Sequence, residues 1–294
     1  MNTPHRRFSL ARIAALTGNT FTGLVRLKVF YFLLLFGLLL IASSVFMAQL
    51  SFQQEFKILK DVSLGAMSVF TSLLAIVATA QLIPRDVEER TIYTILAKPV
   101  PRYEYLMGRL GGALLLLALS ILAMSALFLA LLFVRQEMLA SEVLRQSAGL
   151  PPSQAQEALA SLKASGFNAN LLPGIVIIFL KAALLASLTL FISTFATSNL
   201  FTIVVMVFIY FIGHLQSTAR SYWLQTHGGS WLSQAFLGLV ALAFPDLQLF
   251  NLVDDIVAGT TIPLALFGQT ALLGCVYTSV YLFFAWVIFH GKEL

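Results

Sequence analysis

The chain alternates between long apolar runs and shorter polar segments. An apolar run of about 20 residues is long enough for a helix to cross the hydrocarbon core of a bilayer. The apolar runs predict six transmembrane helices, at residues 29–48, 64–83, 110–134, 174–196, 200–215 and 262–289. A shorter apolar run at 231–244 predicts a re-entrant or interfacial helix before the sixth span, with a seventh crossing as the alternative.

The composition agrees with this pattern. Of the 294 residues, 59% are apolar and 11% are charged, whereas soluble domains contain about 25% charged residues. We therefore expect an all-α polytopic membrane protein. Its net charge of +5 is explained by topology, because lysine and arginine collect on the cytoplasmic segments of membrane proteins. The sequence contains no soluble basic domain, so no nucleic-acid partner is predicted.

Four polar segments divide this single transmembrane domain of residues 1–294. Residues 1–28 contain basic but no acidic residues, with apolar residues interspersed, which predicts an amphipathic helix on the cytoplasmic surface or a basic flank of the first span. Residues 84–109 form a cytoplasmic charged segment. Residues 135–172 predict two short helices outside the membrane, and residues 217–261 form an outer segment that contains the 231–244 helix.

The distribution of basic residues predicts the orientation of the chain. Placing the N-terminus, the charged segment and the C-terminus in the cytoplasm puts eleven lysines and arginines inside and six outside. Because basic loops remain cytoplasmic, we expect both termini on the cytoplasmic side.

The charged segment predicts a short helix at residues 86–97. Acidic residues in its first turn suit the helix dipole, and Pro99 and Pro101 end it because a residue before proline disfavours the α conformation. Pro84 is expected to close the second span. One face of the helix is apolar and the other is charged, which predicts a surface for a partner rather than an ordinary loop. The outward charges are Glu88, Glu89 and Arg90.

The same segment resembles the most characteristic region of ABC-2 type transporter permeases. In that family an acidic–basic pair precedes threonine, followed by leucine, a basic–proline pair, an arginine and a glycine–basic pair. The corresponding residues here are Glu89-Arg90-Thr91, Leu96, Lys98-Pro99, Arg102 and Gly108-Arg109. The chain looks most like the subfamily associated with multicopper enzyme maturation, and Pro245–Asn251 resembles a segment before the last span of that subfamily.

This resemblance implies a permease subunit in the bacterial cytoplasmic (inner) membrane that moves a substrate, by export. A separate ABC ATP-binding subunit would bind ATP and Mg and supply the energy, and two permeases, identical or paired, would assemble with two such subunits. The resemblance implies that Glu88, Glu89, Arg90, Thr91, Tyr93, Lys98 and Arg102 dock the ATP-binding subunit as a coupling helix.

The chain itself is not expected to be an enzyme. It has no G-x-x-x-x-G-K-[ST] phosphate loop, so no catalytic residue and no cofactor are assigned to it. Its one cysteine and seven scattered methionines form no pair suited to copper, so no metal site is predicted.

Two residues within the spans are candidates for a translocation path. Lys181 is the one basic residue well inside a span, and a buried charge in a membrane is costly unless it has a function or reaches the surface. His214 ends the fifth span and is either a path residue or a structural interfacial residue.

Two other functions are compatible with the pattern. The chain could be an ATPase-coupled scaffold or mechanotransmission subunit that translocates nothing. A stand-alone secondary transporter is the other alternative, but it would need paired ionisable groups within its spans, for which only Lys181 is apparent.

Overall fold

The computed structural model describes residues 8–49, 54–90, 100–146, 170–227, 244–251, 253–258 and 263–291, and isolated positions between 156 and 167. Every regular element in this part of the chain is a helix. The helices are α1 (Leu10–Val25), α2 (Lys28–Gln49), α3 (Glu55–Ala80), α4 (Leu82–Glu88), α6 (Arg102–Gln146), α8 (Leu171–Ser193), α9 (Asn199–His227), the 3₁₀ helix η2 (Leu247–Phe250), α11 (Val253–Ala258) and α12 (Leu264–Gly291).

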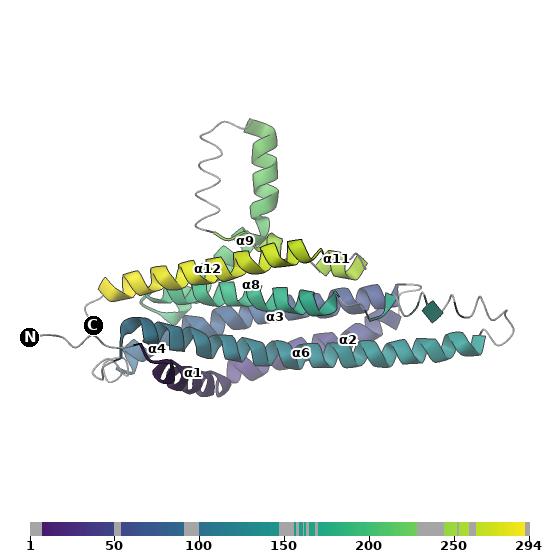
Figure 1. The fold of residues 1–294 in the computed structure, drawn as a ribbon, viewed down its shortest axis with the longest axis horizontal. Coiled ribbons are helices and arrows are strands. Elements are labelled where there is room, and N and C mark those ends of the chain that lie inside the picture. The colour runs from purple at the N-terminus through teal and green to yellow at the C-terminus, as the bar shows by residue number, and fades with distance from the viewer. Residues whose placement is uncertain are drawn as a thin grey trace, which may run out of the picture.

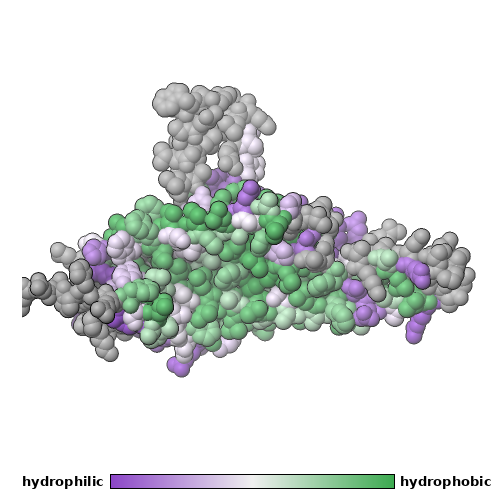
Figure 2. Space-filling model, viewed as in Figure 1, coloured by the Kyte–Doolittle hydropathy of each residue, from purple (hydrophilic) through white to green (hydrophobic). Residues whose placement is uncertain are grey.

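Six stretches of the described chain are long and apolar enough to cross a membrane. They are α2, α3 with α4, α6, α8, α9 and α12. They form an elongated bundle (Figure 1). The space-filling view shows an apolar belt around the middle of the molecule and polar residues towards its two ends (Figure 2). The predicted fold class, an all-α protein with six membrane-spanning helices, is confirmed.

Helices α3 and α8 form the centre of the bundle. Every residue from Lys181 to Leu190 is buried, which is typical of a helix that is apolar on all faces. Helix α8 packs against α3, α6, α9 and α12. In contrast, α2 and α12 leave large apolar side chains exposed, among them Phe32, Phe46 and Leu272, as expected for helices that face lipid.

The two ends of the bundle differ in structure. We call the end that carries α1, α4 and the start of α6 the α4 end, and the last turn of α12 lies there as well (Figure 1). The far end of α6 and α11 lie at the opposite end (Figure 1). Helix α1 packs along the first turns of α6, so the basic N-terminal segment forms the predicted helix but lies against a neighbouring helix.

The second span begins earlier than its apolar run. The apolar run that predicted this span starts at residue 64, whereas α3 is helical from Glu55. Its polar side chains have partners at the end opposite α4: Glu55 forms an ion pair of 2.9 Å with Arg135, and the Lys60 ammonium donates to the Ser165 carbonyl at 2.7 Å. These contacts allow the helix to continue beyond the apolar residues.

The prediction that Pro84 closes the second span was wrong. Pro84 lies in the first turn of α4, where the missing N–H of proline breaks no helical hydrogen bond. The predicted 86–97 helix is also incorrect at its start, since Asp86 is a buried residue within α4. That helix ends at Glu88, and Arg90 has a φ of 56°, a left-handed conformation that interrupts helical geometry.

Two more helices continue past their predicted ends. Helix α6 joins the predicted third span to the helical piece expected around 137–146, which makes one helix of 45 residues that starts at Arg102. Helix α9 continues past residue 215 to His227, and its end stands away from the bundle (Figure 1). The predicted 231–244 helix lies outside the described residues except for Phe244.

Candidate functional site

A buried charged cluster joins α4 to α6 at the α4 end. Asp86 of α4 accepts hydrogen bonds from the Tyr105 hydroxyl and from the Arg109 guanidinium, both on α6. Arg109 also donates to the Thr20 hydroxyl of α1 at 3.2 Å and lies over the Tyr105 ring, 5.3 Å from its centroid. One arginine therefore links three helices, and Tyr105 extends the contact to α12 by stacking on Phe289.

A second ion pair fixes α1 to α6. The Arg12 guanidinium donates to both oxygens of the Glu104 carboxylate, at 2.7 and 2.9 Å, and the backbone N–H of Ser9 donates to the same carboxylate at 3.0 Å. Glu104 has no exposed surface. Its hydrogen bond raises the pKa of Arg12, which keeps this guanidinium charged.

Glycines in α6 let α1 approach closely. A Cβ atom on Gly112 would lie 2.5 Å from the Cβ of Thr20 and 2.9 Å from the backbone nitrogen of Phe21. A Cβ on Gly108 would lie 2.5 Å from the Cβ of Leu16. Small residues permit this kind of helix contact in membranes, so the Gly108–Gly112 spacing visible in the sequence serves the α1–α6 contact.

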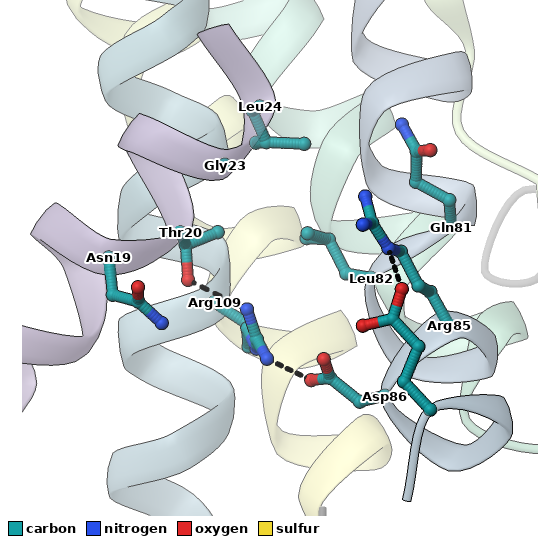
Figure 3. A pocket seen from close by; sticks show the side chains of 10 residues that line it. Asn19, Thr20, Gly23, Leu24, Gln81, Leu82, Arg85, Asp86 and Arg109 are labelled. Carbon is teal, nitrogen blue, oxygen red and sulfur yellow. Dashed lines mark hydrogen bonds and ion pairs between the residues drawn. The ribbon is translucent and has the colours of Figure 1, made fainter. Parts of the chain in front are cut away.

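Between α1 and α4 lies a hollow of about 260 Å³, which we call the α4 hollow. Its walls include Asn19 and Thr20 from α1, Arg85 and Asp86 from α4, and Arg109 (Figure 3). Arg85 and Glu89 form an exposed ion pair of 2.7 Å beside it. The hollow is therefore bounded by charges of both signs.

The predicted docking residues divide into three groups. Glu88, Glu89 and Arg90 are exposed at the end of α4, as their charge indicated. Thr91, Tyr93 and Lys98 lie outside the described residues. Arg102 begins α6, and its guanidinium donates to the carbonyls of Phe289, at 2.8 Å, and His290 at the end of α12, so it holds two spans together.

The two predicted path residues meet in the core of the bundle. The Lys181 ammonium on α8 lies 3.0 Å from the Nε2 atom of His214 on α9 and donates to the Ser68 hydroxyl on α3 at 3.1 Å. It also lies 5.7 Å from the centroid of the Tyr210 ring. Lys181 is only 2% exposed, so it does not extend to the membrane surface, which was the alternative interpretation.

Sequence reasoning missed several members of both clusters. Asp86 was interpreted as an acid in the first turn of a helix and Arg109 as part of a motif, but nothing local indicated that they would pair. The Arg12–Glu104 pair joins residues that are 92 positions apart. Ser68 lies in an apolar run without any distinguishing pattern. Among the described residues, no group of three or more His, Cys, Asp or Glu side chains could hold a metal ion.

The comparisons with known proteins identify the family. Among curated proteins, none matches the chain. A family model described as "ABC-2 family transporter protein" matches residues 24–294, which includes the six spans, α4 and the contact between Lys181 and His214. Members of this family are the membrane subunits of transporters and lack the ATPase domain. The chain therefore belongs to the ABC-2 family of transporter membrane proteins.

Proposed function

We propose that this chain is the permease subunit of an ATP-driven exporter and that its α4 end docks a separate ATP-binding subunit. The observation that carries the proposal is the exposed group Glu88, Glu89 and Arg90, which follows directly on the second span. Permeases of the family generally pair with ATP-binding subunits, and this exposed charged corner supplies both signs of charge for such a contact.

Buried contacts next to the exposed charges of α4 connect this helix to the neighbouring helices. Glu88 is two residues from Asp86, which bonds to Tyr105 and Arg109 of α6. Arg109 also bonds to Thr20 of α1. A displacement of the end of α4 would therefore move α6 and α1 with it, since a buried ion pair with good hydrogen bonds resists separation.

The proposed assembly contains two permeases, identical or paired, and two ATP-binding subunits that carry ATP and Mg. In it the α4 end faces the cytoplasm of a bacterial inner membrane, with both chain termini on that side. The basic residues near the N-terminus and in the charged segment support this orientation. Thr91, Tyr93, Lys98 and the multicopper-maturation subfamily remain part of the proposal on the strength of the sequence resemblance.

The substrate path is proposed to pass Lys181 and His214. What supports this is their contact at the centre of the bundle, between α3, α8 and α9. Polar groups in the middle of a membrane bundle are costly and are retained where they serve transport.

The docking proposal is tested with a charge-removal variant of the α4 end. Glu88→Ala, Glu89→Ala and Arg90→Ala are combined, and the chain is co-produced with ABC ATP-binding subunits from the same genome. We expect at least a tenfold loss of association and of permease-stimulated ATP turnover, which corresponds to about 1.4 kcal/mol of binding free energy. Both are measured on complexes purified in nanodiscs.

A matched control removes the same charges at the opposite end of the bundle. Glu137, Glu142 and Arg145 are exposed on the last turns of α6, and their combined replacement by alanine should leave association unchanged. Equal association of wild type, test variant and control would show that the α4 end is not the docking surface.

A further inference from the structure

The buried ammonium of Lys181, like that of Lys60 at the far end of the bundle, is balanced by no carboxylate among the described residues. By contrast, Asp86 with Arg109 and Glu104 with Arg12 form ion pairs at the α4 end, and the partly buried Glu55 and Arg135 form one at the other end. No carboxylate of the described residues lies within 4.0 Å of the Lys181 ammonium. Its contacts are a hydroxyl, an imidazole and an aromatic ring.

The hydrogen bonds determine which nitrogen of His214 carries a proton. The Nδ1 atom lies 2.9 Å from the carbonyl oxygen of Tyr210, and a carbonyl oxygen only accepts, so Nδ1 carries the proton. In a neutral ring Nε2 is then an acceptor, and it accepts from Lys181. The lysine amine and the imidazole therefore share one excess proton along a contact of 3.0 Å.

We propose that Lys181 and His214 form a proton-binding site within the bundle, which holds one excess proton at rest and takes up a second during the transport cycle. The second proton would bind Nε2 of His214. Once the hydrogen bond from Lys181 to this atom is broken, Nε2 has the only free lone pair of the two side chains. Lys181 would keep the Ser68 hydroxyl as an acceptor and the Tyr210 ring as a cation–π partner.

The surroundings contain one group that would compensate the second charge. From α8 only Lys181 faces His214, α3 contributes the uncharged Ser68, and α9 contributes Tyr210. Asp246, which is 5% exposed and caps η2 by accepting from the N–H of Gln248, lies beside α9, because η2 packs against that helix.

Burial links protonation to conformational change. In the described conformation Lys181 is buried between α3 and α9, whereas His214 is only partly buried, so separation of these helices would uncover the lysine side of the contact. Uptake on one side and release on the other would then accompany each cycle. This transport role rests on the proposed function, whereas the one-proton pair itself does not.

The pair is tested by NMR on the full chain, labelled with ¹⁵N-histidine, in lipid nanodiscs. The chain has four histidines, and the signal of His214 is identified by its loss in His214→Gln. At neutral pH we expect an Nδ1–H tautomer with Nε2 shifted by a strong hydrogen bond. Lys181→Met should remove that hydrogen-bond shift and change the titration midpoint of His214. Ser68→Ala, a milder change, should alter the Nε2 shift with the fold intact.

The second proton is tested by the pH dependence of ATP turnover in the assembled complex. Wild type should show an inflection between about pH 5 and 8, which is lost in His214→Gln and moves to a different pH in Lys181→Met. The control His290→Gln removes an exposed imidazole at the end of α12 and should keep the inflection.

Each outcome decides one claim. An Nε2–H tautomer at neutral pH, or a His214 signal unaffected by Lys181→Met, overturns the one-proton pair. If the NMR signals are as expected but the inflection survives in His214→Gln, the second proton is overturned. Failure of any ATP-binding subunit to associate refutes the proposed function and leaves the NMR result decisive for the pair.

Discussion

Arg109→Met removes the cation at the centre of the α4 end while keeping an unbranched side chain of similar length. Asp86 is 7% exposed and would keep its hydrogen bond from Tyr105 but lose its counter-charge. We expect the free energy of unfolding to fall by about 3–5 kcal/mol, the cost of leaving a buried charge without its partner.

The size of this effect follows from two opposing terms. Two unit charges at a hydrogen-bonded separation of roughly 3 Å attract by about 5–6 kcal/mol at an effective dielectric constant near 20. Removing each ion from water costs several kcal/mol, so the intact pair contributes little net stability. The double variant Asp86→Asn with Arg109→Met should therefore lie within about 2 kcal/mol of wild type, with a coupling energy of about 2–3 kcal/mol.

The measurement is reversible unfolding in mixed micelles of SDS and a mild detergent, followed by tryptophan fluorescence. The Arg85–Glu89 pair is the control on the same helix, because both side chains are about half exposed, and breaking it with Arg85→Gln should cost no more than about 0.5 kcal/mol. Equal losses for Arg85→Gln and Arg109→Met, or additive effects of Asp86→Asn and Arg109→Met, would refute the reasoning.

Two further predictions concern helix contacts. Gly112→Ala places a Cβ atom 2.5 Å from Thr20 and should lower the melting temperature of the detergent-solubilised protein. The control Gly65→Ala, where a Cβ meets nothing within 4 Å, should raise stability by about 0.5–1 kcal/mol. A lower melting temperature for both variants would contradict the close-contact argument. Arg102→Ala removes the donor to the Phe289 and His290 carbonyls and should speed amide hydrogen exchange in the last turn of α12. Unchanged exchange there would show that Arg102 does not hold α6 and α12 together.

The spans were predictable because lipid imposes a length on apolar helices. The first span was expected at 29–48 and is Lys28–Gln49, and the fourth was expected at 174–196 and is Leu171–Ser193. Helix ends outside the apolar runs were not predictable from hydropathy. Whether α3 begins at Glu55 depends on its contact with Arg135, 80 residues away.

The candidate sites were predictable as single residues but not as groups. The exposed charges of Glu88 and Glu89 followed from local pattern, and Lys181 stood out because it interrupts an apolar run. Its contact with His214, 33 residues away, depends on how α8 and α9 pack. Asp86 was misplaced for a similar reason, since its burial depends on α6 lying against α4.

The two clusters use charge in opposite ways, and this difference suits an ATP-driven permease. At the α4 end each buried charge has an opposite partner, so separating the helices would leave uncompensated ions at a cost of several kcal/mol, and the helices move as one body. In the core, the single charge is held by Lys181, His214 and Ser68 through hydrogen bonds that water or a substrate can replace. We therefore expect α3, α8 and α9 to separate at lower cost than α1, α4 and α6, and propose that the bundle opens at the Lys181 cluster while the α4 end transmits force.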